Sequence, residues 1–147
     1  MALALIRGQG DRRNEAIILN SLGVSLTRLG RPDEARTVLE ESLTLSRHLG
    51  EEELEAHALA SLGQVSLSAH DLSGAAEYFE RSRAVRHTIG DRVGEGWMHL
   101  RLAGLRHRIG DRAGALDAQA AAAAAAAETN DGALLAACAE GVRETSD

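Results

Sequence analysis

The chain has 147 residues, about the length of one domain, and a formal net charge of −6, which argues against a nucleic-acid backbone as its partner. All sixteen basic residues are arginine, and the lack of lysine excludes Schiff-base chemistry and a phosphate-loop lysine. One cysteine excludes an internal disulfide and fits a reducing cytoplasm, and no run of about 18 apolar residues predicts a membrane span.

The first predicted helix covers residues 12–29. Asp11 stands at the position of an N-cap, and Gly30 stands where the helix should stop. Apolar residues recur along it at spacings of three and four, the pattern of one helical face. These residues are Ala16, Ile18, Leu19, Leu22, Leu26 and Leu29.

The second predicted helix begins at Pro32, because proline suits the first helical turn, where its missing N–H would have no partner. Gly50 ends this helix. Its apolar stripe consists of Ala35, Val38, Leu39, Leu43 and Leu45. Residues 11–50 therefore form one repeat made of a helix, a tight turn, a second helix and a short turn.

The same pattern returns in residues 51–90, with a turn at His70-Asp71, and in residues 91–130, with a turn at Gly110-Asp111. A fixed period in this range predicts stacked repeats, since one such pair of helices cannot bury its apolar face alone. The residues that recur every 40 positions are Leu22-Gly23, Leu62-Gly63 and Leu102-Ala103; Ala35, Ala75 and Ala115; Gly10-Asp11, Gly50-Glu51 and Gly90-Asp91; and Glu15, Glu55 and Glu95. We expect Gly23 and Gly63 to let paired helices approach closely, with Ala35 and Ala75 facing them.

Residues 131–147 differ from the repeats and contain one helix, predicted over 132–144. Leu134, Cys138 and Val142 should pack on the third repeat, as expected of a terminal cap. The preceding tract Ala120–Ala127 has high helix propensity but shows no amphipathic face. We interpret this tract as drift at a weakly constrained outer helix, in preference to a docking surface for another helix.

Residues 1–10 match the end of a second helix, so the sequence enters the pattern inside a repeat. An apolar face built from Leu3, Leu5 and Ile6 would then lack a neighbour. Two interpretations stay open. Either the chain is the C-terminal part of a longer array, or this face is covered by self-association, as in a homodimer formed through the N-terminal helix.

The residues at these recurring positions resemble the tetratricopeptide repeat, with aliphatic residues at several of its aromatic positions. The matching residues are Leu19, Leu22, Gly23, Leu26, Ala35 and Leu39, and then Leu59, Leu62, Gly63, Ala75 and Phe79. The resemblance implies an all-α fold over residues 1–147, in which antiparallel helix-turn-helix repeats stack into a right-handed α-solenoid. The 40-residue length is similar to the extended subtype of kinesin light chain and Pins-family adaptors, and to repeat arrays of bacterial regulators.

In this family the first helix of each repeat lines a concave groove, so the resemblance implies a partner-binding surface. The lining is mostly apolar, with polar points and arginines at its ends, which favours a peptide or protein with some acidic character. Trp97 is the candidate aromatic anchor, or it packs between adjacent first helices. The candidate groove residues are Ile17, Asn20, Val24, Arg28, His57, Gln64, Leu67, Trp97, Leu100, His107 and Arg108.

We expect no catalytic residues, no cofactor and no metal. The histidines are not spaced three or four apart on one helix, and no Cys or carboxylate cluster completes a tetrahedral set. Ser68, His70 and Asp71 are too close in sequence to form a catalytic triad. The leading hypothesis is a cytoplasmic, non-enzymatic interaction scaffold without direct contact to nucleic acid or membrane. The alternative is a regulatory or sensor segment of a larger bacterial signal-transduction or transcriptional regulator.

Overall fold

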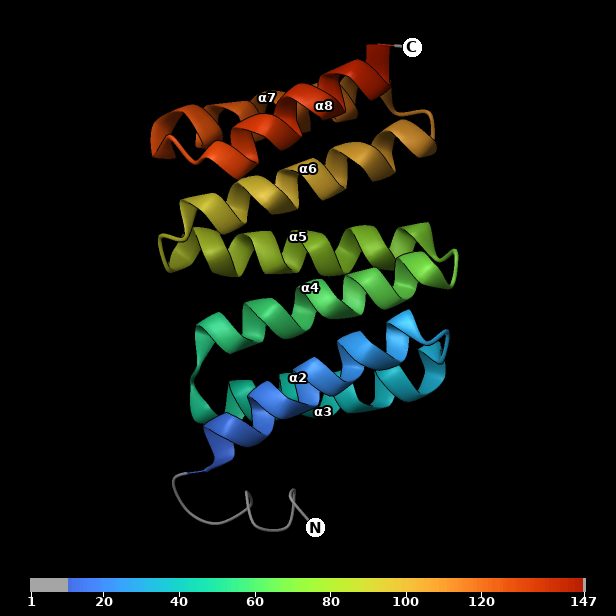
Figure 1. Cartoon of the computed structure of the whole chain (residues 1–147), viewed down its shortest axis with the longest axis vertical. Helices are drawn as coiled ribbons and strands as arrows, with labels where there is room; N and C mark the ends of the chain where they lie inside the picture. The colour runs from blue at the N-terminus through green and yellow to red at the C-terminus, as the bar shows by residue number, and fades with distance from the viewer. Residues whose placement is uncertain (1–10, 147) are drawn as a thin grey trace. The chain divides into compact units, whose positions relative to one another are not determined.

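In a computed structural model of the chain, residues 11–146 are described, with side chains over 11–141, and this part is all-α (Figure 1). The predictions for residues 1–10, including the homodimer through the N-terminal helix, lie outside the described residues. No helix in the described part is both long and apolar enough to cross a membrane. The helices are α2 (Arg12–Arg28), α3 (Pro32–Leu49), α4 (Glu52–Ser68), α5 (Leu72–Thr88), α6 (Arg92–Arg108), α7 (Arg112–Thr129) and α8 (Gly132–Ser146).

The chain divides into two compact units, Met1–Arg81 (unit 1) and Ser82–Asp147 (unit 2), and the division falls within α5. Unit 1 contains α2, α3, α4 and the first part of α5. Unit 2 contains the end of α5 and α6, α7 and α8. The predicted repeat boundaries at residues 50, 90 and 130 fall in the turns before α4, α6 and α8.

Most of the helices are followed by a residue with left-handed backbone conformation, at the same position in each repeat. A glycine with positive φ ends a helix most cheaply, because it has no β-carbon to clash. His70 and Asn130 adopt the same conformation, with φ of 61° and 55°, at positions where the other repeats carry glycine. The glycines with positive φ are Gly30, Gly50, Gly90 and Gly110. The predicted stops at Gly30 and Gly50 are therefore confirmed.

Side chains of aspartate cap the starts of several helices. Asp91 and Asp111 each accept a hydrogen bond at 2.9 Å from the backbone N–H three residues later, at Gly94 and Gly114. Pro32 is the first residue of α3, as predicted. Asp11 lies at the N-cap position of α2, but its side chain makes no capping hydrogen bond.

In unit 1, α3 packs against both α2 and α4, and α2 also contacts α4. Close approach depends on glycine: a β-carbon on Gly23 would lie 2.3 Å from Leu39 Cγ, and one on Gly63 would lie 2.6 Å from Phe79 Cε1. Ala35 and Ala75, which were predicted to face these glycines, are fully buried, and the atoms nearest to each glycine belong to Leu39 and Phe79. Larger side chains, one turn further along the second helix, fill the space that each glycine leaves.

The predicted apolar face of α2 is only partly buried. Leu19 is buried, but Ile18 is 39% exposed and Leu22 is 42% exposed. Their equivalents in α4, Ala58 and Leu62, are fully buried. The reason is position in the array: α4 follows α3 and contacts it, whereas α2 is the first helix of the described part. Leu29, also predicted on this face, is 70% exposed in the turn before α3.

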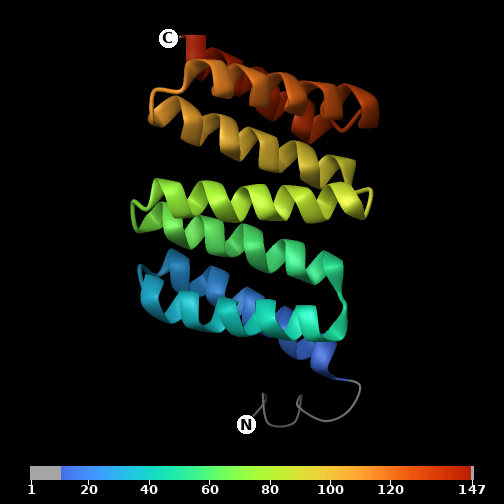
Figure 2. The ribbon, with the colours of Figure 1, turned by 180° about the vertical axis from the view of Figure 1, so that it is seen from behind.

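In unit 2, α7 packs against both α6 and α8. Figure 1 shows α8 in front of α7, and Figure 2, from the opposite side, shows α7 in front of α8. The interpretation of the alanine tract as a weakly constrained outer helix was wrong, because Ala122, Ala125 and Ala126 are at most 1% exposed and form a cluster with Leu134 and Cys138. Alanine suits this face since its small side chain lets helices approach closely. The predicted packing of Leu134 and Cys138 is confirmed, and the side chain of Val142 lies outside the described part.

Candidate partner-binding faces

The predicted binding residues of α2 lie along one face of that helix. Ile17, Asn20 and Val24 are half-buried, and Arg28 is exposed in the last turn. Their spacing of three, four and four residues places them above one another on the helix surface. The face offers two aliphatic side chains and one amide, with a positive charge at its C-terminal end.

The predicted residues of α4 continue this pattern within unit 1. Gln64 and Leu67 are half-buried, whereas His57 is exposed, with its Nε2 atom 4.0 Å from Glu53 Oε1. Because α2 and α4 contact each other, unit 1 contributes two adjacent first helices with partly accessible apolar and amide side chains.

The amide of Asn20 is the least satisfied polar group on this face. Its Oδ1 atom is shielded from solvent and accepts no hydrogen bond from the described residues. A buried amide oxygen without a donor costs about 1–3 kcal/mol.

In unit 2 the predicted face of α6 is partly used for internal packing. Trp97 and Leu100 are half-buried and pack against the cluster of Ala122, Ala125, Ala126, Leu134 and Cys138. Gly96 allows this contact, because a β-carbon there would lie 2.6 Å from Leu134 Cδ2. The interpretation in which Trp97 packs between helices therefore accounts for part of its surface. His107 and Arg108 are exposed at the C-terminal end of α6.

Contacts between a basic side chain and a glutamate link the end of one repeat to the start of the next, and the sequence reasoning missed them. In unit 1, Arg47 Nε lies 3.0 Å from Glu55 Oε1. In unit 2, His87 Nδ1 lies 2.8 Å from Glu95 Oε2. Both glutamates were already among the residues that recur every 40 positions. A base eight residues before each of them was the signal that could have identified the pairs.

Glu95 is the most enclosed of these acids, with 2% of its side chain exposed. Besides His87, it pairs with Arg83 at 3.7 Å and with Arg92. Arg92 also donates from Nε to Glu128 Oε2 at 3.0 Å, which joins the start of α6 to the end of α7. Hydrogen bonds to Glu128 and then to Glu95 raise the pKa of Arg92 above its ordinary value.

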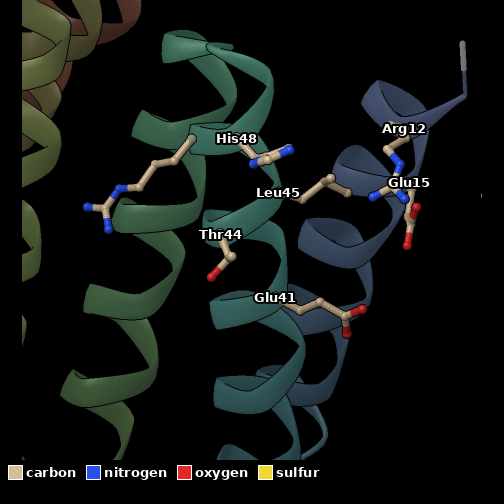
Figure 3. A pocket seen from close by; sticks show the side chains of 7 residues that line it. Arg12, Glu15, Glu41, Thr44, Leu45 and His48 are labelled. Atoms are coloured by element: carbon tan, nitrogen blue, oxygen red, sulfur yellow. The ribbon is translucent and has the colours of Figure 1, made fainter.

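An open pocket of about 930 Å³ lies on α2 and α3 in unit 1 and contains none of the predicted residues (Figure 3). Antiparallel pairing brings the start of α2 beside the end of α3, and this register was the signal that could have located it. Its lining mixes both signs of charge, with one leucine. The lining residues are Arg12, Glu15, Glu41, Thr44, Leu45, Arg47 and His48.

Other chemistry is sparse in the part of the chain that the structure describes. There, no group of three or more His, Cys, Asp or Glu side chains could hold a metal ion. The thiol of Cys138 is buried beside Leu134, and this burial raises its pKa above the ordinary value. A thiol in such surroundings is a poor nucleophile, because the thiolate is the reactive form.

Comparisons with known proteins give the same fold. The family model for the tetratricopeptide repeat matches residues 2–87. The TPR domain of Arabidopsis FLU is similar in structure, with a TM-score of 0.71 and 20% identity, over 77% of this chain and 95% of that one. A Rap protein, solved in complex with Competence and Sporulation Factor, is similar with a TM-score of 0.67 and 20% identity, over 82% of this chain and 39% of the Rap chain. None of the curated proteins matches the sequence.

Proposed function

Because the chain belongs to the tetratricopeptide repeat family, we propose that it is a non-enzymatic scaffold that binds a peptide or protein on the first helices of its repeats. The observation that carries the proposal is the face of α2 and α4 in unit 1. There, aliphatic side chains and two amides are partly accessible on helices that contact each other. Folded helices bind an amphipathic or extended segment through such a combination of apolar contact and amide hydrogen bonds.

The ends of these helices favour a partner with acidic groups. Arg28 lies at the C-terminal end of the predicted face of α2, and His107 and Arg108 lie at the C-terminal end of the predicted face of α6. All three side chains are exposed. An exposed guanidinium recognises a carboxylate with directed, charge-assisted hydrogen bonds. The similar Rap structure, which contains Competence and Sporulation Factor, supports the use of this fold for holding a partner.

The test is affinity measurement with a partner captured by the purified chain from its native cell extract and then itself purified. Substituting Arg28→Ala or Gln64→Ala should weaken binding by about tenfold each, the effect of a moderate hot spot. Trp97→Ala is less suitable, because Trp97 also packs against the cluster in unit 2. Arg108→Ala is the better probe of α6.

Matched controls come from the second helix of the same pair. Arg36→Ala and Glu40→Ala change charged residues of α3 that lie outside the predicted faces. They should leave affinity unchanged. If the α3 substitutions weaken binding and the three first-helix substitutions do not, the partner binds elsewhere and the proposal is wrong.

A further inference from the structure

Gly104 lies in α6 between Leu100 and Arg108, two of the predicted binding residues, and the packing of unit 2 does not require a glycine there. Gly104 is exposed, and a β-carbon added to it would meet no atom within 4 Å. Gly96, two turns earlier in the same helix, has Leu134 directly against it. Because glycine is a poorer helix former than alanine, the chain without a partner gains nothing from glycine at position 104.

The missing side chain leaves an open gap on this face of α6. Leu100 and Arg108 each lie four residues from Gly104, so the three residues share one side of the helix. In unit 1, the equivalent repeat positions carry the half-buried side chains of Val24 and Gln64. At the Gly104 gap, helix backbone is instead exposed between an apolar side chain and a guanidinium. Glycine is the residue that permits such a close approach of a ligand to the backbone.

The charge differs between the two ends of the gap. His107 and Arg108 are exposed at one end, and neither side chain forms a hydrogen bond or an ion pair with another described residue. At the other end, Glu140 of α8 is exposed, and a β-carbon on the adjacent Gly141 would lie 3.8 Å from Leu100 Cδ2. An acidic group of a partner is therefore attracted to the Arg108 end and repelled from the Leu100 end.

We propose that the Gly104 gap binds the aromatic side chain of a peptide in which an acidic residue stands next to the aromatic one, and this proposal rests on the function proposed above. The ring contacts Leu100 and lies against the backbone at Gly104. The planar guanidinium of Arg108 stacks on the ring and donates from its edge to the neighbouring carboxylate. An aliphatic side chain would gain the contact with Leu100 but not the stacking on Arg108, which is why the gap favours an aromatic residue.

The probe is a library of short random peptides displayed on phage and selected on the immobilised full chain. Selection should enrich an aromatic residue next to Asp or Glu. One enriched peptide is then synthesised, and its affinity is measured by titration calorimetry. Gly104→Ala should weaken its binding by about tenfold, because the added methyl group occupies the gap, although the same substitution favours the helix. Replacing the aromatic residue of the peptide by leucine should also weaken binding.

The matched control is Gly132→Ala in α8. Gly132 is a helical glycine of the same unit, and a β-carbon added there also meets no atom within 4 Å. The substitution adds the same methyl group away from the Gly104 gap and should leave the affinity for the peptide unchanged.

The outcomes separate this proposal from the proposed function. If Arg108→Ala weakens peptide binding and Gly104→Ala does not, the gap is unused and the inference is wrong, while binding on the first helices stands. Selection that enriches no peptide, or peptides without an aromatic–acidic pair, also overturns the inference. If the substitutions at Arg28, Gln64 and Arg108 leave the affinity for a selected peptide unchanged as well, the proposed function fails with it.

Discussion

Gly96 lies directly against Leu134, so closely that a β-carbon on Gly96 would stand 2.6 Å from Leu134 Cδ2 and 3.1 Å from Ala125 Cβ. This contact brings α6, α7 and α8 together at one point in unit 2. Gly104, two turns further along α6, has no atom within 4 Å of an added β-carbon. Substituting each of the two glycines by alanine therefore measures how much close helix packing contributes to the free energy of unfolding.

Gly96→Ala should destabilise unit 2 by about 1–3 kcal/mol, because the added methyl overpacks a filled site. Gly104→Ala should instead stabilise α6 by up to about 1 kcal/mol, since alanine is the better helix former. Urea unfolding followed by the fluorescence of Trp97, the single tryptophan, reports on this unit. Equal effects of the two substitutions would contradict the packing described for Gly96.

Two buried serines should respond in opposite ways to removal of the hydroxyl. Ser42 Oγ donates to the carbonyl of Ala16 at 2.8 Å and joins α3 to α2. Ser66 Oγ is buried without a hydrogen-bond partner among the described residues. Ser42→Ala should cost about 1 kcal/mol, whereas Ser66→Ala should be neutral or stabilising by up to about 1 kcal/mol. Thermal unfolding followed by circular dichroism distinguishes them, and a larger loss for Ser66→Ala would refute the assignment.

His70→Gly should stabilise unit 1 by about 1 kcal/mol, because a left-handed residue with a β-carbon is strained by about that amount. His70 has a φ of 61° where the other repeats carry Gly30 and Gly110. Asn130→Gly is the control, with a smaller gain expected since asparagine tolerates this conformation. Denaturant midpoints provide the measurement, and a loss of stability for His70→Gly would show that its side chain contributes more than the turn strain costs.

The buried thiol of Cys138 should make unit 2 less stable in alkali. Its pKa is raised by burial, whereas in the unfolded chain it ionises near the ordinary value of about 8.5. Above that pH the unfolded state loses a proton that the folded state keeps, so the free energy of unfolding falls as pH rises. Cys138→Ala removes the titrating group.

The measurement compares urea unfolding of the wild type and Cys138→Ala near neutral pH and above about pH 9. The wild type should lose more stability than the variant between the two conditions. Parallel curves would mean that the thiol has the same pKa in both states.

The sequence alone predicted the helices and their order, because each repeat contains the residues that start and end its own helices. Gly50 ends α3 and Asp91 caps α6 through local geometry alone. The alanine tract was misinterpreted for a different reason. In a run of identical alanines, no difference in hydrophobicity marks the buried face of the helix. That face, with Ala122, Ala125 and Ala126, can be identified only from the packing of Leu134 against it.

The candidate faces could be located by register, but their accessibility could not. Trp97 and Leu100 occupy predicted positions on α6, yet part of their surface packs against the cluster formed with α8. The pocket beside Glu15 was missed because it depends on residues from two antiparallel helices that no single sequence pattern links. The side-chain contacts between helices could therefore be determined only from the three-dimensional structure.

Ala127 and Leu135 occupy, before and within α8, the repeat positions that Arg47 and Glu55 hold before and within α4, so these two positions form no ion pair beside α8. Added salt screens the Arg47–Glu55 ion pair, and sulfate strengthens apolar burial of the kind that holds Leu134. Added sulfate should thus weaken the Arg47–Glu55 contact between α3 and α4 while strengthening the attachment of α8. Among the described residues, the attachment of α8 should therefore withstand this salt better than the contact of α3 with α4 does.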